Sequence, residues 1–138
     1  MYIRYDRAKD PYSLQFLPLH PWGPKSAEVL STLHPDLLFI ANKLANVYNV
    51  SAISGYRGKE EQTEYYNKGT GVSWPTSNHN VRPSLALDII PWPTQYDSIP
   101  HFDMMLGAVE AIAAEQRIAI RLGKHFSYRQ DYPHIELQ

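Results

Sequence analysis

The chain has 138 residues, of which 43% are hydrophobic and 20% charged, which suits one globular domain rather than a disordered chain. A formal net charge of −1 argues against a nucleic-acid-binding protein, because phosphate binding needs a basic surface. The absence of cysteine excludes disulfides and thiolate metal sites. Residues 1–24 carry charge and proline where a signal peptide would be apolar, and no run reaches the roughly 18 apolar residues of a membrane span. We therefore expect a single domain over residues 1–138, made in the cytoplasm without a signal peptide and not inserted in a membrane.

The first part of the chain predicts an irregular extension followed by two helical segments. Residues 1–25 are rich in proline and aromatic residues, and we expect an irregular or short-strand segment that wraps on the domain. Ser26 is a plausible N-cap of the first helix, and Pro35 suits the first position of the second. The second helix would bury one apolar face, made by Leu37, Ala41, Leu44 and Tyr48.

The remaining elements mix short strands with helices. In chain order they are a strand at 50–54, a polar helix at 58–69 that Gly69 ends, a loop at 71–84, a buried strand at 85–90, a helix at 102–116, and strands at 118–122 and 134–137. The helix at 102–116 would face inward with Phe102, Met105, Leu106, Val109, Ile112 and Ala113. Helices first, then strands mixed with one more helix, indicate an α+β fold with a small, mainly antiparallel sheet and helices packed on it.

One aspartate, Asp88, interrupts the otherwise apolar strand at 85–90. An ionised carboxylate there is costly unless it is paired or bound to a metal. His79, in the preceding loop, and His134, at the start of the last strand, both lie where a strand meets a loop. Two imidazoles and a carboxylate are an ordinary ligand set for catalytic zinc, which keeps one position open for water. One hypothesis is a zinc site at strand ends; the other is an arginine partner or a turn-capping role for Asp88, with structural roles for both histidines.

Two further residues would complete a hydrolytic site. Asp131 lies three residues before His134, so it could be the general base for a zinc-activated water, or it could cap a turn. Arg57 could stabilise an oxyanion or hold a substrate carboxylate, or it could form a surface ion pair with Glu60 or Glu61.

Four segments, in this order, resemble motifs of the zinc peptidases that include D-alanyl-D-alanine carboxypeptidases and bacteriophage L-alanyl-D-glutamate endolysins. They are LHPDLLFIANKLA (33–45), ISGYRGKEEQ (53–62), SNHNVRPSLALDIIPWP (77–93) and DYPHIEL (131–137). The third has the longer spacing of phage members. The likeness covers about residues 26–138, and LGKHFSYRQ (122–130) stands where many phage members carry a Gly-Gly-Asp-Trp-like stretch.

The resemblance implies a ligand set for Zn²⁺, a catalytic base, a stabiliser of the carbonyl and oxyanion, and two substrate contacts. In that order they are His79, Asp88 and His134; Asp131; Arg57; and Ser77 with Gln62. The implied protein is a monomeric phage endolysin that cuts the L-alanyl-D-glutamate bond of the peptidoglycan stem peptide. It would reach the wall from the host bacterial cytoplasm once the membrane is permeabilised. The alternatives are a D-alanyl-D-alanine carboxypeptidase, or a non-catalytic wall-binding or virion structural module of the same fold.

Overall fold

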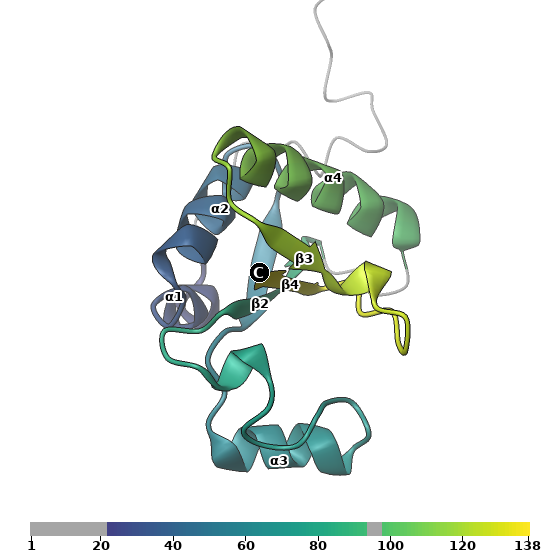
Figure 1. Cartoon of the computed structure of the whole chain (residues 1–138). Helices are drawn as coiled ribbons and strands as arrows, with labels where there is room; N and C mark the ends of the chain where they lie inside the picture. Colours follow the sequence, from purple (N-terminus) through teal and green to yellow (C-terminus); the bar gives the residue numbers. More distant parts are fainter. Residues whose placement is uncertain (1–21, 94–97) are drawn as a thin grey trace, which may run out of the picture.

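One four-stranded sheet with helices packed on it organises the chain, of which the computed structural model describes residues 22–93 and 98–138 (Figure 1). The helices are α1 (Pro24–Leu30), α2 (Pro35–Ala45), α3 (Lys59–Asn67) and α4 (Ile99–Glu115), with short 3-10 turns η3 (Asn78–Asn80) and η4 (Gly123–His125). The strands are β1 (Val50–Ser54), β2 (Ala86–Pro91), β3 (Ile120–Leu122) and β4 (His134–Leu137). The α+β fold with an antiparallel sheet, expected from the sequence, is confirmed.

The extension expected at residues 1–25 falls mostly outside the described residues, which begin at 22. Its last two residues, Pro24 and Lys25, belong to α1. Within the described ranges, no helix is long and apolar enough to span a membrane.

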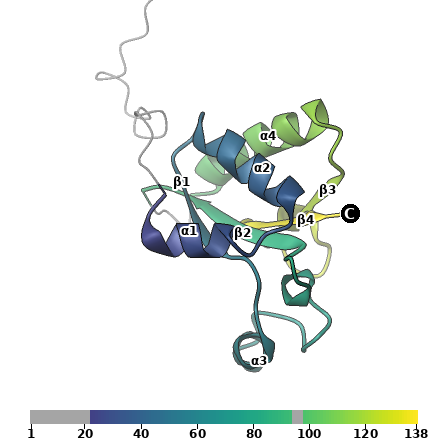
Figure 2. The same cartoon turned by 90° about the vertical axis from the view of Figure 1, so that its left-hand side faces the viewer.

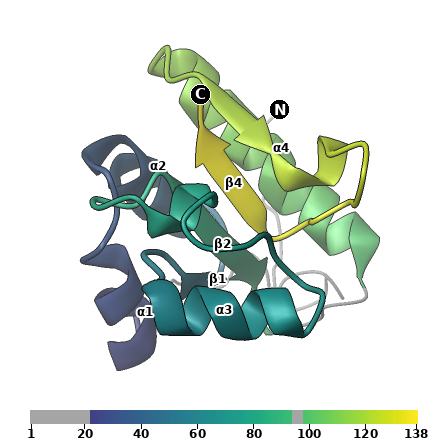
Figure 3. The ribbon, with the colours of Figure 1, turned by 60° about the horizontal axis from the view of Figure 1, so that its bottom comes forward.

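The sheet has the strand order β1-β2-β4-β3, and each neighbouring pair is antiparallel. Its register places Asp88 of β2 opposite Ser54 of β1 on one side and opposite His134 of β4 on the other. Figure 3 shows β2 and β4 side by side, with α3 below them in this view. The centre of the sheet therefore brings together a hydroxyl, a carboxylate and an imidazole from three strands that are distant in the sequence.

The two faces of the sheet differ because successive side chains of a strand point to opposite sides. Leu87 and Ile89 of β2 and Ile135 of β4 are each 0% exposed and belong to the apolar core. Asp88 and His134 occupy the alternate positions and so point to the other face. Helices α2 and α4 lie on the core side of the sheet, and α3 lies on the opposite side (Figure 1, Figure 2). Asp88 can interrupt an apolar run because its side chain points to the polar face of the sheet and not into the core.

The predicted N-cap at Ser26 is wrong. Helix α1 begins at Pro24, with Gly23 as its N-cap, since proline suits the first helical turn. Ser26 lies within the helix and is buried, and its hydroxyl accepts a hydrogen bond from the backbone N–H of Ala52 at 3.1 Å. The serine therefore ties α1 to β1 instead of starting the helix.

Helix α2 begins at Pro35, as predicted, and His34 is its N-cap: the ring Nδ1 accepts from the backbone N–H of Asp36 at 3.1 Å. The apolar face expected for this segment is confirmed, since Leu37, Ala41, Leu44 and Tyr48 are all buried. On α4 the inward face is confirmed for Phe102, Met105, Leu106, Val109 and Ala113, whereas Ile112 is only partly buried.

Helix α3 is polar, and Gln62 is its only buried residue. The helix ends at Asn67, and Gly69 follows with φ of +74°, a left-handed conformation that favours glycine. The predicted end of this helix at Gly69 is therefore confirmed. Because its apolar surface is small, α3 contributes to the polar side of the molecule and not to the core.

Two adjacent methionines of α4 give a matched test of this core. Met105 is 0% exposed and Met104 is 45% exposed. Met105→Ala should lower the free energy of unfolding by about 2–5 kcal/mol, because it leaves a cavity. Met104→Ala should change it by no more than about 0.5 kcal/mol. Urea denaturation of both variants measures the difference, and equal losses would mean that α4 is not packed as described.

Candidate metal centre

Three side chains from three segments converge on the polar face of the sheet: His79 from η3, Asp88 from β2 and His134 from β4. His79 Nε2 and His134 Nδ1 lie 3.3 Å apart, and they lie 3.3 and 3.2 Å from Asp88 Oδ1. A tetrahedral zinc ion with ligand bonds of about 2.0–2.2 Å needs its ligand atoms roughly 3.3–3.6 Å apart. The donor types and their separations therefore fit a metal ion of this size, and all three residues are the ligands expected from the sequence.

The fold positions the three side chains in two ways. The antiparallel register sets Asp88 opposite His134. His79 is held by a capping box in η3: the Ser77 hydroxyl accepts from the His79 backbone N–H at 3.1 Å, and the Ser77 N–H donates to Asn80 Oδ1 at 3.1 Å. The His79 carbonyl also accepts from the Arg57 backbone N–H at 2.7 Å. Hydrogen bonds on both sides of His79 thereby hold this loop residue in place.

Each histidine has a partner on the ring nitrogen that faces away from the centre. His79 Nδ1 donates to the Gly55 carbonyl at 2.7 Å, which leaves the Nε2 lone pair directed at the other ligands. His134 presents Nδ1 to the centre, and its Nε2 lies 3.4 Å from Glu136 Oε1. Such outer partners are typical of metal-binding histidines, because they fix the tautomer and the ring orientation.

Asp88 uses its two carboxylate oxygens for different partners. Oδ2 accepts from Arg57 Nη2 at 2.6 Å, while Oδ1 faces the two histidines. The arginine partner and the metal-ligand role, considered as alternatives from the sequence, are thus geometrically compatible. Burial by itself would raise the pKa of Asp88, but the nearby His79 and His134 outweigh it and hold this pKa well below its usual range.

Arg57 is 6% exposed and is not the surface ion pair with Glu60 or Glu61 that was the alternative reading. Besides its bond to Asp88, its Nε donates to Ser54 Oγ at 2.8 Å. Its guanidinium lies 4.0 Å from the centre of the Tyr65 ring. The side chain is therefore held rigidly beside the metal-ligand group, in a position from which it can meet developing negative charge.

Gln62 and Ser77, the two expected substrate contacts, both form hydrogen bonds with other residues of the protein. Gln62 is 0% exposed; its Nε2 donates to the Val72 carbonyl at 2.6 Å, and its Oε1 accepts from Arg57 and from Asn80 Nδ2. Gln62 thereby supports the Arg57 side chain from within the fold. Ser77 is half-buried and caps η3. Direct contact of either residue with substrate stays a prediction.

Asp131 is half-buried and lies in the segment that leads into β4. Its backbone N–H donates to the Gly123 carbonyl at 2.9 Å, and its carbonyl accepts from the His134 N–H at 3.2 Å. Burial, and then the negative charge of Asp88, raise the pKa of its carboxyl group. The carboxylate therefore lies within electrostatic reach of the ligand group, although no hydrogen bond joins it to the three ligands.

Gly123, which the sequence did not single out, makes room for this segment. A Cβ at this position would lie 2.2 Å from the Asp131 carbonyl oxygen and 2.7 Å from His134 Cβ. The spacing between Asp131 and His134 therefore depends on the absence of a side chain here. The only sequence signal was the glycine itself, just after the predicted strand at 118–122.

Glu136 is the second residue whose place the sequence did not reveal. It is 5% exposed, and hydrogen bonds from Arg121 and Asn78 reach its carboxylate. Burial opposes ionisation, but His134 and Arg121 outweigh it and lower the pKa of Glu136 to about 2. Its spacing of two from His134 in a strand was the available signal, since such residues share a face.

The segment LGKHFSYRQ places two aromatic rings beside the centre. The ring centres of Phe126 and His134 lie 5.4 Å apart, and Tyr128 stacks on Phe126 at 5.5 Å. Tyr128 is 76% exposed. The segment that departs from the phage pattern therefore places a half-buried ring, Phe126, and an exposed ring, Tyr128, on one side of His134.

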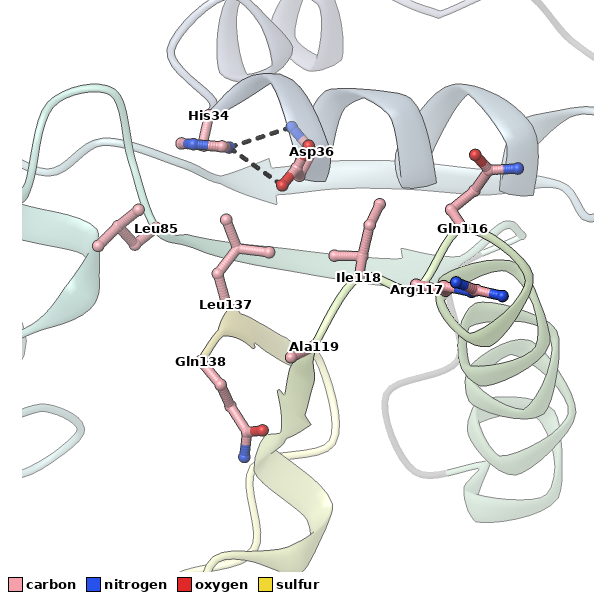
Figure 4. Close-up of a pocket in the computed structure, with 9 residues that line it drawn as sticks. All are labelled: His34, Asp36, Leu85, Gln116, Arg117, Ile118, Ala119, Leu137 and Gln138. Atoms are coloured by element: carbon pink, nitrogen blue, oxygen red, sulfur yellow. Dashed lines mark hydrogen bonds and ion pairs between the residues drawn. The ribbon is translucent and has the colours of Figure 1, made fainter.

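A separate cavity of about 450 Å³ lies away from the metal-ligand group. It lies between the start of α2, the turn after α4 and the end of β4, as Figure 4 shows. Its lining consists of His34, Asp36, Leu85, Gln116, Arg117, Ile118, Ala119, Leu137 and Gln138. None of the expected site residues borders it.

A solved structure with the same fold is that of the Serratia marcescens L-Ala D-Glu endopeptidase ChiX, with a TM-score of 0.73. The two chains are 23% identical, and the match covers 83% of this chain and 87% of that chain. No protein-family model matches the sequence, and no curated protein does. At this identity the likeness establishes the shared fold, so the activity has to be argued from the side chains of the site.

We expect His79→Ala, Asp88→Ala and His134→Ala each to weaken zinc binding by more than the about 10- to 100-fold that outer partners contribute, because each removes a ligand atom. His125→Ala, an exposed histidine of η4, is the matched control and should bind as the wild type does. Competition with a chromophoric chelator measures the affinity. Unchanged binding in all three ligand variants would remove the metal centre from this protein.

Proposed function

We propose that the protein is a zinc-dependent peptidase that cleaves the stem peptide of bacterial peptidoglycan at the L-alanyl-D-glutamate bond. The observation that carries the proposal is the convergence of His79 Nε2, Asp88 Oδ1 and His134 Nδ1 at 3.2–3.3 Å from one another. The fold shared with an L-Ala D-Glu endopeptidase supports the substrate class. A module that only binds the cell wall has no evident need for this ligand set together with a carboxylate of raised pKa.

The chemistry would be the hydrolysis of a peptide bond, in which different side chains hold the metal ion and transfer the proton. A zinc ion held by His79, Asp88 and His134 would polarise the scissile carbonyl and lower the pKa of the attacking water toward 7. Asp131 would take the proton from that water and pass it to the leaving amine. Its raised pKa suits this task, because a base works best when its pKa lies near the operating pH.

Arg57 would share the negative charge that develops on the carbonyl oxygen. Its bonds to Ser54 and Asp88 and its contact with Tyr65 hold the guanidinium before the reaction begins, so no reorganisation is needed at that moment. A planar guanidinium that is already anchored on one edge is well suited to this role.

The biological role that we propose is that of a phage endolysin in host lysis. The protein would act as a single-domain monomer over residues 1–138. It would be made in the host cytoplasm and would reach the peptidoglycan after the membrane is permeabilised. The support for this role is the phage-like spacing of the segment at 77–93.

Digestion of purified muropeptides tests the choice of bond. Incubation with the zinc-loaded protein should separate the L-alanine that remains on the sugar from a peptide that begins with D-glutamate. Mass spectrometry of the products identifies the cut. Release of free D-alanine from a pentapeptide stem would instead make the protein a D-alanyl-D-alanine carboxypeptidase, and no product at all, with zinc bound, would favour the non-catalytic module.

Asp131→Asn separates a catalytic base from a ligand and from a turn cap. The amide keeps the size of the side chain but removes the basic site, so turnover should fall by about 10²- to 10⁴-fold. The loss should appear in kcat more than in KM, because proton transfer belongs to the transition state. Zinc content and melting temperature should stay near those of the wild type.

The matched control is Asp36→Asn, a second aspartate-to-asparagine change, which lies in the separate cavity and should leave turnover unchanged. Loss of zinc from Asp131→Asn would make Asp131 a ligand. A large drop in its melting temperature would make it a turn cap. Retained turnover would mean that another group is the base.

A further inference from the structure

Glu136 connects the two histidines of the metal centre through contacts that the proposed reaction does not use. It lies on β4 two residues after His134, on the same face of the sheet, and is 5% exposed. We propose that Glu136 is a positioning residue: it orients the His134 ring and, through Asn78, holds the turn that carries His79. This inference rests on the proposed metal centre and deepens it.

The first contact acts on His134. Glu136 Oε1 lies 3.4 Å from His134 Nε2, on the ring edge away from the other ligands. A neutral imidazole has one N–H and one lone pair, so a carboxylate beside Nε2 favours the tautomer with its hydrogen there. The lone pair then stays on Nδ1, which is the nitrogen that faces Asp88 Oδ1 at 3.2 Å. The carboxylate thereby selects the form of His134 that can bind a cation.

The second contact acts on His79. Asn78 Nδ2 donates a hydrogen bond to Glu136 Oε2, the oxygen that does not face His134. Asn78 directly precedes His79 in η3, so the bond fixes the turn from which His79 extends. A single carboxylate therefore links a strand residue and a loop residue that lie 55 positions apart in the sequence.

Arg121 holds Glu136 in place for both contacts. Residue 121 of β3 is the register partner of residue 136 of β4, and Arg121 Nη2 donates to Glu136 Oε1 at 3.1 Å. A buried carboxylate without partners would be costly, whereas three neighbouring donors satisfy this one. Both oxygens are occupied, and the carboxylate lies on the far side of the His134 ring from Asp88. Glu136 therefore acts through His134 and Asn78, and not on a substrate.

Glu136→Gln tests the first contact, because the amide keeps the shape but removes the charge. The dissociation constant for zinc should rise about 10- to 100-fold, the range found when outer partners of metal ligands are changed. Glu110→Gln, an exposed glutamate of α4, is the matched control and should bind zinc as the wild type does. Chelator competition gives both constants, and the melting temperatures without metal show that the variants are folded.

Proton NMR of the zinc-loaded protein adds a readout that a merely structural role would not move. The wild type should show a strongly downfield Nε2–H signal from His134 that is lost or shifted in Glu136→Gln. The Nδ1–H signal of His79, whose partner is the Gly55 carbonyl, serves as the internal control and should persist. A His134 signal unchanged in the variant would overturn the proposal.

Asn78→Ala tests the second contact and keeps the buried carboxylate, so it also serves if Glu136→Gln does not fold. It should weaken zinc binding, and its effect combined with Glu136→Gln should be smaller than the product of the two single effects, because both act through one carboxylate. Wild-type zinc affinity in folded Glu136→Gln or in Asn78→Ala would overturn this inference alone. Failure of the wild type to bind zinc would overturn the metal centre and the proposed function with it.

Discussion

The pairing of Asp88 with His134 across β2 and β4 is the constraint on which the rest of the site depends. A shift of this register by one residue would turn Asp88 into the apolar core and bring Leu87 or Ile89 to the polar face. The fully buried Leu87, Ile89 and Ile135 oppose such a shift, because each would lose its place in the core. The hydrophobic effect on one face of the sheet therefore fixes the geometry of the candidate metal ligands on the other.

The buried charges on the polar face are stable because each has hydrogen-bond and ion-pair partners. Arg57 and Asp88 form a close pair, and Ser54 and Gln62 take up further donors of the guanidinium. Buried charges are tolerable only when such partners are complete, and removal of one member leaves the others unpaired. The bond that Gln62 donates to the Val72 carbonyl and the bond that it accepts from Asn80 extend the network into the loop that carries His79. Ligand position and loop conformation therefore depend on one set of hydrogen bonds.

The buried residues of the candidate metal centre and the exposed residues beside it lie on different segments of the chain. The candidate metal ligands come from two central strands and a capped turn, whereas Asp131 and the rings of Phe126 and Tyr128 lie on the segment between β3 and β4. A metal centre needs fixed ligand distances, while contact with a large substrate needs accessible side chains. The fold places an exposed segment beside a buried hydrogen-bond network, an arrangement that would suit the proposed reaction.

Sequence patterns were sufficient for the fold class, the strand positions, the start of α2 and the buried faces of α2 and α4, because periodicity and proline act locally. The three side chains that converge were proposed from a carboxylate in an apolar strand, from the positions of two histidines, and from the resemblance of the four segments to the zinc peptidases. Sequence patterns failed at Ser26, where a tertiary bond to β1 replaces a helix cap. They also could not show that Arg57 and Gln62 are buried, that Gly123 makes room for Asp131, or that Glu136 contacts both His134 and Asn78. Those facts depend on which segments the folded chain brings together, and a contact across 55 residues leaves no local pattern in the sequence.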